Sequence, residues 1–407
     1  MDTKDVQSEN DGETSKAEDY RFRRLIETFR PGLAIESFLG IFRFKLEGDD
    51  LVPPSKLCKF ISFVTSTFIV AMFIVFRVFP TAVIGEPYEF DAFKEFPCFV
   101  IFCQYWIACL LTTSVYNDSN IKVMTEICHM DTVMHLNVVD DFYKKAHRET
   151  IVIFVILMVA HSILDFCDIY SDGILTVSGI MLIIVYFCQD LGLLAFYKLI
   201  SMLQARLETL NVYLKHVRGE QANNSIISNI EEKNETGKNM KVNRVSIKLN
   251  DLAFLYDKIG ETCALINDVF NFQIFMILVS AFTYIIVTIW STLYRVRYDK
   301  EEDTGNLTRI VIWSGRCICT VSVLCYICEK LISTRNDTKI LVNDIIMDYD
   351  QPRQIRLQAK AFMELIEAWT LNISVYDMFF VDITLILKFI SVATTYLIVI
   401  IQISHFI

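Results

Sequence analysis

Seven apolar runs constrain this chain more than any other feature, because each is long enough to cross the ~30 Å hydrocarbon core of a bilayer as a helix. Hydrophobic residues make up 53% of the 407 positions and the mean hydropathy is +0.40, which excludes an ordinary soluble domain. The sequence therefore predicts an all-α membrane protein with seven transmembrane helices. The expected spans are Phe60–Phe76, Pro97–Val115, Ile151–Ile169, Ile174–Leu199, Phe272–Leu293, Ile310–Cys328 and Phe380–Ile403.

The distribution of Lys and Arg predicts the direction of the chain across the membrane. Basic residues are frequent in the N-terminal tail and in the second, fourth and sixth connections, and nearly absent from the first and third. We therefore expect a cytoplasmic N-terminus and an extracellular C-terminus. The fifth connection is an exception, with Arg295, Arg297 and Lys300. It also carries a glycosylation sequon at Asn306, on the predicted outer side. The polar start of the chain argues against a cleaved signal peptide.

Helical periodicity continues beyond the spans and predicts a second layer of helices. We expect residues 1–56 to be a cytoplasmic tail and 57–407 to be one seven-helix domain. Within it, 201–265 and 333–378 include helices with apolar faces, which need partners. The prediction is a cytoplasmic helical anchor domain; the alternative is separate amphipathic helices that lie on the bilayer. Residues 219–243 are rich in Asn, Ser, Glu and Lys, which predicts disorder.

Several classes of function lack any support in the sequence. There is no Gly-rich phosphate loop, no His-Glu-x-x-His and no Gly-x-Ser-x-Gly, and the six His have no ligand spacing. We therefore expect no enzyme activity, no metal and no cofactor. Lys and Arg form no basic face, so nucleic acid is not an expected partner. Most of the 12 Cys lie in apolar spans as small hydrophobes, although a disulfide between Cys98 and Cys167 is left open.

The last span, residues 379–407 with its entry, carries one polar stripe. A Gln deep in an apolar span is costly unless it faces protein or water. Steps of three or four residues place this Gln on one helical face with four other residues. Such a helix is typical of a pore lining shared between subunits, but a Lys facing the pore would repel cations. The stripe comprises Lys388, Ser391, Thr395, Val399 and Gln402.

A second candidate site lies in the predicted outer half of the bundle. His161, Asp165 and Arg316 fall there, and we expect Asp165 to pair with Arg316, whereas Asp190 is expected nearer the inner side. Aromatic walls with a few polar groups suit a small-molecule pocket. The alternatives are a purely structural ion pair and, for the Trp residues, an interfacial aromatic belt. The further candidates at matching depth are Gln104, Tyr105, Tyr284, Trp290 and Trp313.

The last span also resembles a known family. Thr395 and Tyr396, then five apolar residues and Gln402, resemble the C-terminal signature of insect gustatory receptors, with Ile403 in place of the final Phe. The Phe379–Asp382 segment resembles the family's entry to its last helix, although Asp377 stands near where many members have Gly. Residues 29–42 resemble the segment before the first span.

This resemblance implies a ligand-gated, non-selective cation channel in the cell membrane of a gustatory neuron. It implies a homotetramer, or a heterotetramer with related receptors, in which the four last helices surround one pore. The ligand would be a small tastant bound in the outer half of each bundle. Leu397 stands where the main sugar-receptor group has Glu, which favours a bitter or other plant compound over a sugar. The implied pore and gate residues are Thr395, Tyr396, Val399, Gln402 and Ile403.

Three alternatives stay open on the sequence. A fructose-type sugar receptor fits the same resemblance. A G-protein-coupled receptor also has seven spans, but it predicts an extracellular N-terminus, and the chain has neither Asp-Arg-Tyr after the third span nor Asn-Pro-x-x-Tyr in the seventh. A transporter would favour Pro- or Gly-broken helices at its site, whereas Pro here is confined to connections and span ends.

Overall fold

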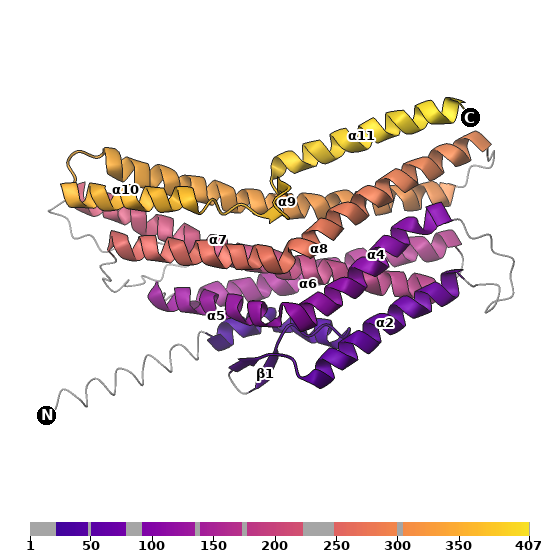
Figure 1. The fold of residues 1–407 in the computed structure, drawn as a ribbon, viewed down its shortest axis with the longest axis horizontal. Helices are drawn as coiled ribbons and strands as arrows, with labels where there is room; N and C mark the ends of the chain where they lie inside the picture. The colour runs from indigo at the N-terminus through magenta and orange to yellow at the C-terminus, as the bar shows by residue number, and fades with distance from the viewer. Residues whose placement is uncertain are drawn as a thin grey trace.

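The computed structural model describes residues 22–47, 50–78, 92–134, 139–172, 177–222, 248–298 and 304–406. A helix over residues 22–38 comes first and leads into a short antiparallel hairpin, β1 (Lys45–Glu47) and β2 (Asp50–Val52), in which Lys45 pairs with Val52. Long helices follow and lie side by side in one elongated bundle (Figure 1). They are α2 (Lys56–Val78), α4 (Ala92–Leu110), α5 (Asn117–Val133), α6 (Val139–Asp172), α7 (Val177–Ala222), α8 (Leu249–Tyr298), α9 (Thr304–Met347), α10 (Arg353–Ala368) and α11 (Ile383–Phe406).

The expected spans are present as helices. Six helices contain apolar segments long enough to cross a membrane, and α11 carries a shorter apolar segment, Ile383–Tyr396. Their outer surfaces suit lipid, because α2 exposes Phe60, Phe63 and Phe68 by 46–64%. The all-α fold with seven apolar helices is thereby confirmed, and the chain is a multi-pass membrane protein. The direction in which it crosses the bilayer stays a prediction.

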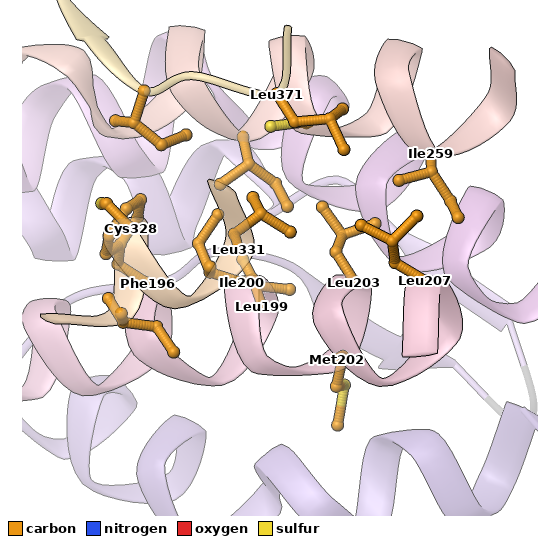
Figure 2. Packing of buried hydrophobic residues seen from close by; sticks show 14 of the residues in the cluster. Phe196, Leu199, Ile200, Met202, Leu203, Leu207, Ile259, Cys328, Leu331 and Leu371 are labelled. Atoms are coloured by element: carbon orange, nitrogen blue, oxygen red, sulfur yellow. The ribbon is translucent and has the colours of Figure 1, made fainter. Parts of the chain in front are cut away.

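Three helices are far longer than a span. α7, α8 and α9 have 46, 50 and 44 residues, so each measures about 65–75 Å, roughly twice the hydrocarbon thickness. Their extensions pack with α5 and α10 around a continuous apolar core, and Figure 2 shows Leu203, Leu207, Ile259 and Leu331 meeting inside it. Separate helices lying on the bilayer are therefore not what the structure shows. Placement of this layer in the cytoplasm stays a prediction, and most of 219–243 lies outside the described residues.

A buried ionic contact ties three elements of this extension together. Arg206 in α7, with a 2% exposed side chain, donates at 2.8 Å to Asp131 of α5 and at 2.8 Å to the Tyr143 hydroxyl of α6. The Tyr143 hydroxyl in turn donates to Asp131. Because a buried charge is costly without partners, this contact fixes how α5, α6 and α7 meet.

Candidate functional site

A strained turn holds the N-terminal end of α11 (Ile383–Phe406) in place. Strands β3 (Ser374–Val375) and β4 (Phe379–Phe380) form a hairpin with two residues in each strand, and its turn places Tyr376 and Asp377 at φ 46° and 55°. Such left-handed backbone favours Gly and is strained for other residues. Two Asn side chains of α8 accept hydrogen bonds from this turn: Asn267 from the Ser374 amide at 3.2 Å and Asn271 from the Tyr376 amide at 2.9 Å.

Two carboxylates satisfy the first amides of α11. Asp382 caps the helix, since its Oδ1 accepts from the Leu385 amide at 3.0 Å and the Thr384 hydroxyl at 2.6 Å. Glu329 of α9 accepts from the Ile383 amide at 3.2 Å. Negative groups at a helix N-terminus stabilise it through the unsatisfied N–H groups and the helix dipole. The start of α11 is thus fixed to both α8 and α9.

One edge of α11 faces the bundle. Leu385 is buried, and Phe389 and Tyr396 pack against Phe282 of α8 with ring centroids 5.9 Å and 5.6 Å apart. In Figure 1, α11 lies at the periphery of the bundle and runs in the same direction as the last part of α8. Tyr396, which the family resemblance assigned to the pore, therefore contacts the helix bundle of its own chain.

The predicted polar stripe lies about a quarter of a turn from this edge, on the open surface of α11. All five of its members, from Lys388 to Gln402, are exposed in the isolated chain. The Thr395 hydroxyl donates to the Ser391 carbonyl at 2.9 Å, so this polar group is satisfied within the helix. Lys388 shares the face of Gln402. The side chain of Ile403 lies outside the described set.

The charged cluster inside the bundle differs from the predicted pair. Arg316 of α9 donates to Asp190 of α7 at 2.9 Å, and His161 of α6 lies 2.9 Å from the same carboxylate oxygen. Asp190 is therefore the partner of Arg316, in place of the expected Asp165. The side chain of Asp165 lies outside the described residues.

Helix length explains why the sequence placed Asp190 at the wrong depth. His161 lies 11 residues before the end of α6, Asp190 lies 13 residues after the start of α7, and Arg316 lies 12 residues after the start of α9. At 1.5 Å per residue, all three are about 16–20 Å from the same end of the bundle. The sequence prediction ended the fourth span at Leu199, which made Asp190 look close to the inner boundary.

Aromatic rings cover this ionic cluster. The Arg316 guanidinium lies 4.4 Å from the ring centroid of Tyr186 and 5.6 Å from that of Trp313. Trp313 is 5% exposed and also packs against Tyr284 at 6.4 Å, so it lies in the packed interior of the bundle and not in an interfacial belt. Trp290 is half-buried and lies about 9 Å further along α8 than Tyr284, at the end of its apolar segment, as a belt residue would.

A small polar cavity lies beside the aromatic wall. Its volume is about 30 Å³, and Gln104, Tyr105, Gln189 and Gln273 line it. The Gln189 amide donates to Gln104 at 3.4 Å, and the buried Tyr105 hydroxyl has no hydrogen-bond partner in the described part of the chain. An unpaired buried hydroxyl indicates a place for water or a ligand oxygen.

Gly192 gives this cavity its shape. The Gln273 side chain lies so close to the Gly192 backbone that a Cβ there would stand 1.7 Å from the Gln273 amide nitrogen. A side chain at residue 192 would have to displace the Gln273 amide from this position. The amide of Gln273 is thereby brought to the wall formed by α7.

The structure thus brings together most of the predicted pocket and adds residues that sequence reasoning missed. Gln104 and Tyr105 reach the polar cavity, while His161, Tyr284, Trp313 and Arg316 gather at the ionic cluster. The missed residues are Tyr186 and Gln189 of α7, while Asp190 of the same helix had been expected nearer the inner side. The sequence does contain a signal for them, because positions 186, 189 and 190 are three and four residues apart, and such spacing puts polar and aromatic groups on one face of an apolar helix.

Two predicted residues stay outside this description. The Asn306 side chain, the expected glycosylation site, lies beyond the described set, although its backbone is in the first turn of α9. The side chain of Cys167 lies outside it too, so the alternative disulfide with Cys98 stays open. Within the described part of the chain, no group of three or more His, Cys, Asp or Glu could hold a metal ion.

The fold defines the class first: a helical multi-pass membrane protein with a pocket of aromatic and polar side chains in its interior. Sequence comparison then gives the family. The model of the 7tm chemosensory receptor family matches residues 29–405, and the chain belongs to this family. That family is a receptor class and not an enzyme class. A search of curated proteins gave no match.

Solved structures show the same fold. The insect olfactory receptor OR5 from Machilis hrabei, in complex with eugenol, is similar with a TM-score of 0.59 at 12% identity. A second structure of that receptor gives a TM-score of 0.53 at 12% identity. In both cases the alignment covers 94% of this chain and 99% of the other. At this identity the likeness establishes the fold alone.

Proposed function

We propose that this protein is a gustatory receptor that acts as a ligand-gated, non-selective cation channel. The observation that carries the proposal is the open polar stripe of α11, because five residues selected by spacing alone are all exposed in the isolated chain. In a membrane, an exposed Gln402 needs water or another subunit beside it. Four copies of α11 around one axis supply both, so the proposed assembly is a homotetramer or a heterotetramer with related receptors.

The proposed gate lies at the C-terminal half of α11. Val399 and Gln402 follow one another along the stripe. In a tetramer, four Val399 side chains would form an apolar ring that can close the pore by dewetting, and four Gln402 side chains would form a polar ring that rehydrates a passing ion. Thr395 extends the lining, and Ile403 belongs to it by position in the signature. Lys388 lies near the other end, where four ammonium groups would lower the local cation concentration.

The proposed ligand is a small aromatic plant compound of bitter type. The cluster of Tyr186, Tyr284 and Trp313 supports an aromatic ligand, since aromatic walls with one charged group provide stacking and orientation. A sugar is the second candidate. The amides of Gln104 and Gln189 and the unpaired Tyr105 hydroxyl favour a hydroxylated ligand in the adjoining cavity.

Helix α8 offers a direct route from pocket to pore. Tyr284 contacts Trp313 in the pocket, and Phe282, two residues earlier, contacts Phe389 and Tyr396 of α11. A ligand that binds one arrangement of α8 more tightly than another shifts the population of that arrangement. Movement of α8 then carries α11 with it, and the four stripes separate.

Whole-cell recording tests this proposal. Cells that express this chain alone are exposed to a panel that includes quinine, caffeine, fructose and sucrose. We expect an inward cation current with at least one compound, and altered current or gating for Gln402→Ala at unchanged surface expression. Ile390→Ala, at an exposed residue of α11 that lies more than a quarter of a turn from every stripe residue, is the matched control and should behave like wild type. Currents that are identical in wild type and Gln402→Ala would contradict the pore assignment.

A further inference from the structure

We propose that a second cavity, between the N-terminal helix (residues 22–38) and helices α5, α6 and α7, binds the phosphate of an anionic lipid, with the ammonium of Lys198 as its partner. This cavity has a volume of about 40 Å³. The buried pair of Glu36 and Arg43 lines both this cavity and the polar cavity described above, and so separates them. The proposal is independent of the ligand site and of the pore.

Lys198 is the reason to expect an anion. Its side chain is 5% exposed, yet its ammonium makes one hydrogen bond, to the Ala146 carbonyl of α6 at 3.3 Å. The nearest carboxylate oxygen, on Glu149, lies 3.9 Å away on a side chain that is 54% exposed. An ammonium has three donors, and a buried charge with so few partners is costly. A phosphate oxygen in the cavity would supply the missing acceptors.

The other charges at this cavity already neutralise each other. Arg43 donates to both carboxylate oxygens of Glu36, at 2.7 Å and 2.8 Å. Among the described residues that line the cavity, Lys198 is then the remaining charge. The lining therefore carries one net positive charge, which the exposed Glu149 carboxylate at 3.9 Å balances only weakly, and this favours an anion over a neutral head group.

The depth of Lys198 suits a head group. It lies 21 residues after the start of α7, or about 32 Å along the helix, which is the thickness of the hydrocarbon core. Under the predicted orientation this is the cytoplasmic leaflet, whose anionic lipids attract basic surfaces. Lys198 therefore lies where a lipid phosphate would be.

The N-terminal helix has the character of an interfacial helix. It buries Leu25 and Ile26, while Arg23 and Arg30 are exposed and Phe38 is 88% exposed. An amphipathic helix of this kind lies in the plane of the head groups. It therefore brings its own wall of the cavity to the level of lipid phosphates.

The apolar lining and Gly32 fit a lipid better than a free ion. Phe29, Leu33, Leu191 and Leu194 line the cavity beside Lys198, so the first carbons of a lipid would meet apolar side chains. Gly32 lies on the same wall, and a Cβ built there would meet nothing within 4 Å. The absence of a side chain at Gly32 thus keeps this space open. The volume accommodates head-group oxygens, with the acyl chains outside.

Thermal unfolding of the full-length protein in nanodiscs tests the assignment. Nanodiscs of phosphatidylcholine alone are compared with nanodiscs that also contain phosphatidic acid. Wild type should show a higher Tm with phosphatidic acid, and Lys198→Met should lose this increase. Lys198→Arg should retain it. Lys145→Met is the matched control, because Lys145 is an exposed Lys of α6 close to Ala146, and it should also retain the increase.

A second variant keeps the test decisive. Gly32→Leu fills the open space and leaves Lys198 intact, so it should also lose the increase in Tm. Native mass spectrometry should show about tenfold less retained phosphatidic acid for Lys198→Met than for Lys145→Met. An increase in Tm that survives in Lys198→Met would overturn the proposal. Equal stabilisation by inorganic phosphate in detergent would assign the site to a free anion and overturn the lipid as its occupant.

Discussion

Asp190 is the residue on which the interior of the bundle depends, because one carboxylate oxygen accepts from both His161 and Arg316. The sequence identified all three as polar residues in apolar helices, but it paired Arg316 with Asp165. Pairing across helices depends on where each helix begins and ends, and hydropathy alone did not fix that for α7. The choice of residues was therefore predictable, whereas their partners were not.

Removal of one member of the Asp190–Arg316 pair should destabilise the protein strongly. Arg316→Met leaves the Asp190 carboxylate buried without its cation, and such losses cost about 3–5 kcal/mol. The double variant Asp190→Leu/Arg316→Met should recover most of the lost stability. Thermal unfolding of all variants in one detergent measures the coupling. Additive effects of the two substitutions would show that the pair is not coupled.

The turn before α11 provides a prediction about backbone strain. Asp377 has φ 55°, and its Oδ1 accepts from the Ser374 hydroxyl at 3.1 Å. Both Asp377→Ala and Asp377→Gly remove this hydrogen bond, but Gly alone tolerates the left-handed backbone. The Gly variant should be about 1 kcal/mol more stable than the Ala variant. Equal unfolding temperatures for the two would argue against strain at this turn.

Helix α11 was the element best predicted from sequence. Spacing alone identified its polar stripe, because a single polar face on an apolar helix is a strong periodic signal. Tyr396 shows the limit of this reasoning, since the signature does not reveal that its ring packs on Phe282. Contacts between a terminal helix and a neighbour distant in sequence are invisible to local periodicity.

The contact of Phe282 with α11 should influence gating. Phe282→Ala removes two ring contacts, worth about 0.5–1.5 kcal/mol each, that hold α11 in its present position. Together the two contacts are worth about 1–3 kcal/mol, so we expect a shift of about five- to 150-fold in the concentration of agonist that gives half-maximal current. Phe254→Ala, at an exposed residue near the other end of α8, is the control. An unchanged dose–response curve would exclude α8 as the route to the pore.

The molecule as a whole combines a span layer with a helical extension, and the sequence predicted both from the length of the periodic segments. Hydropathy located the spans because a bilayer imposes a fixed thickness. It did not predict that Arg206 would be buried against Asp131 and Tyr143, because the basic residues of a connection are usually solvated. Three-dimensional packing of the extension decides that contact.

The extension should be sensitive to Arg206. Arg206→Met leaves Asp131 buried without its cation and should lower the free energy of unfolding by about 3–5 kcal/mol. Lys215→Met, a substitution at an exposed residue two turns further along α7, should have little effect. Size-exclusion chromatography and thermal unfolding of the purified variants measure the difference. Equal behaviour of the two variants would show that this buried pair does not hold the extension together.

Modification of Gln402→Cys by a charged thiol reagent tests most directly whether the stripe of α11 lines a pore. A ligand from the quinine, caffeine, fructose and sucrose panel activates the current, and the reagent is then applied from outside. We predict irreversible block of the Gln402→Cys current, with no block of wild type or of Ile390→Cys, whose side chain lies on another exposed face of α11. Block of Ile390→Cys with an unaffected Gln402→Cys current would contradict the account.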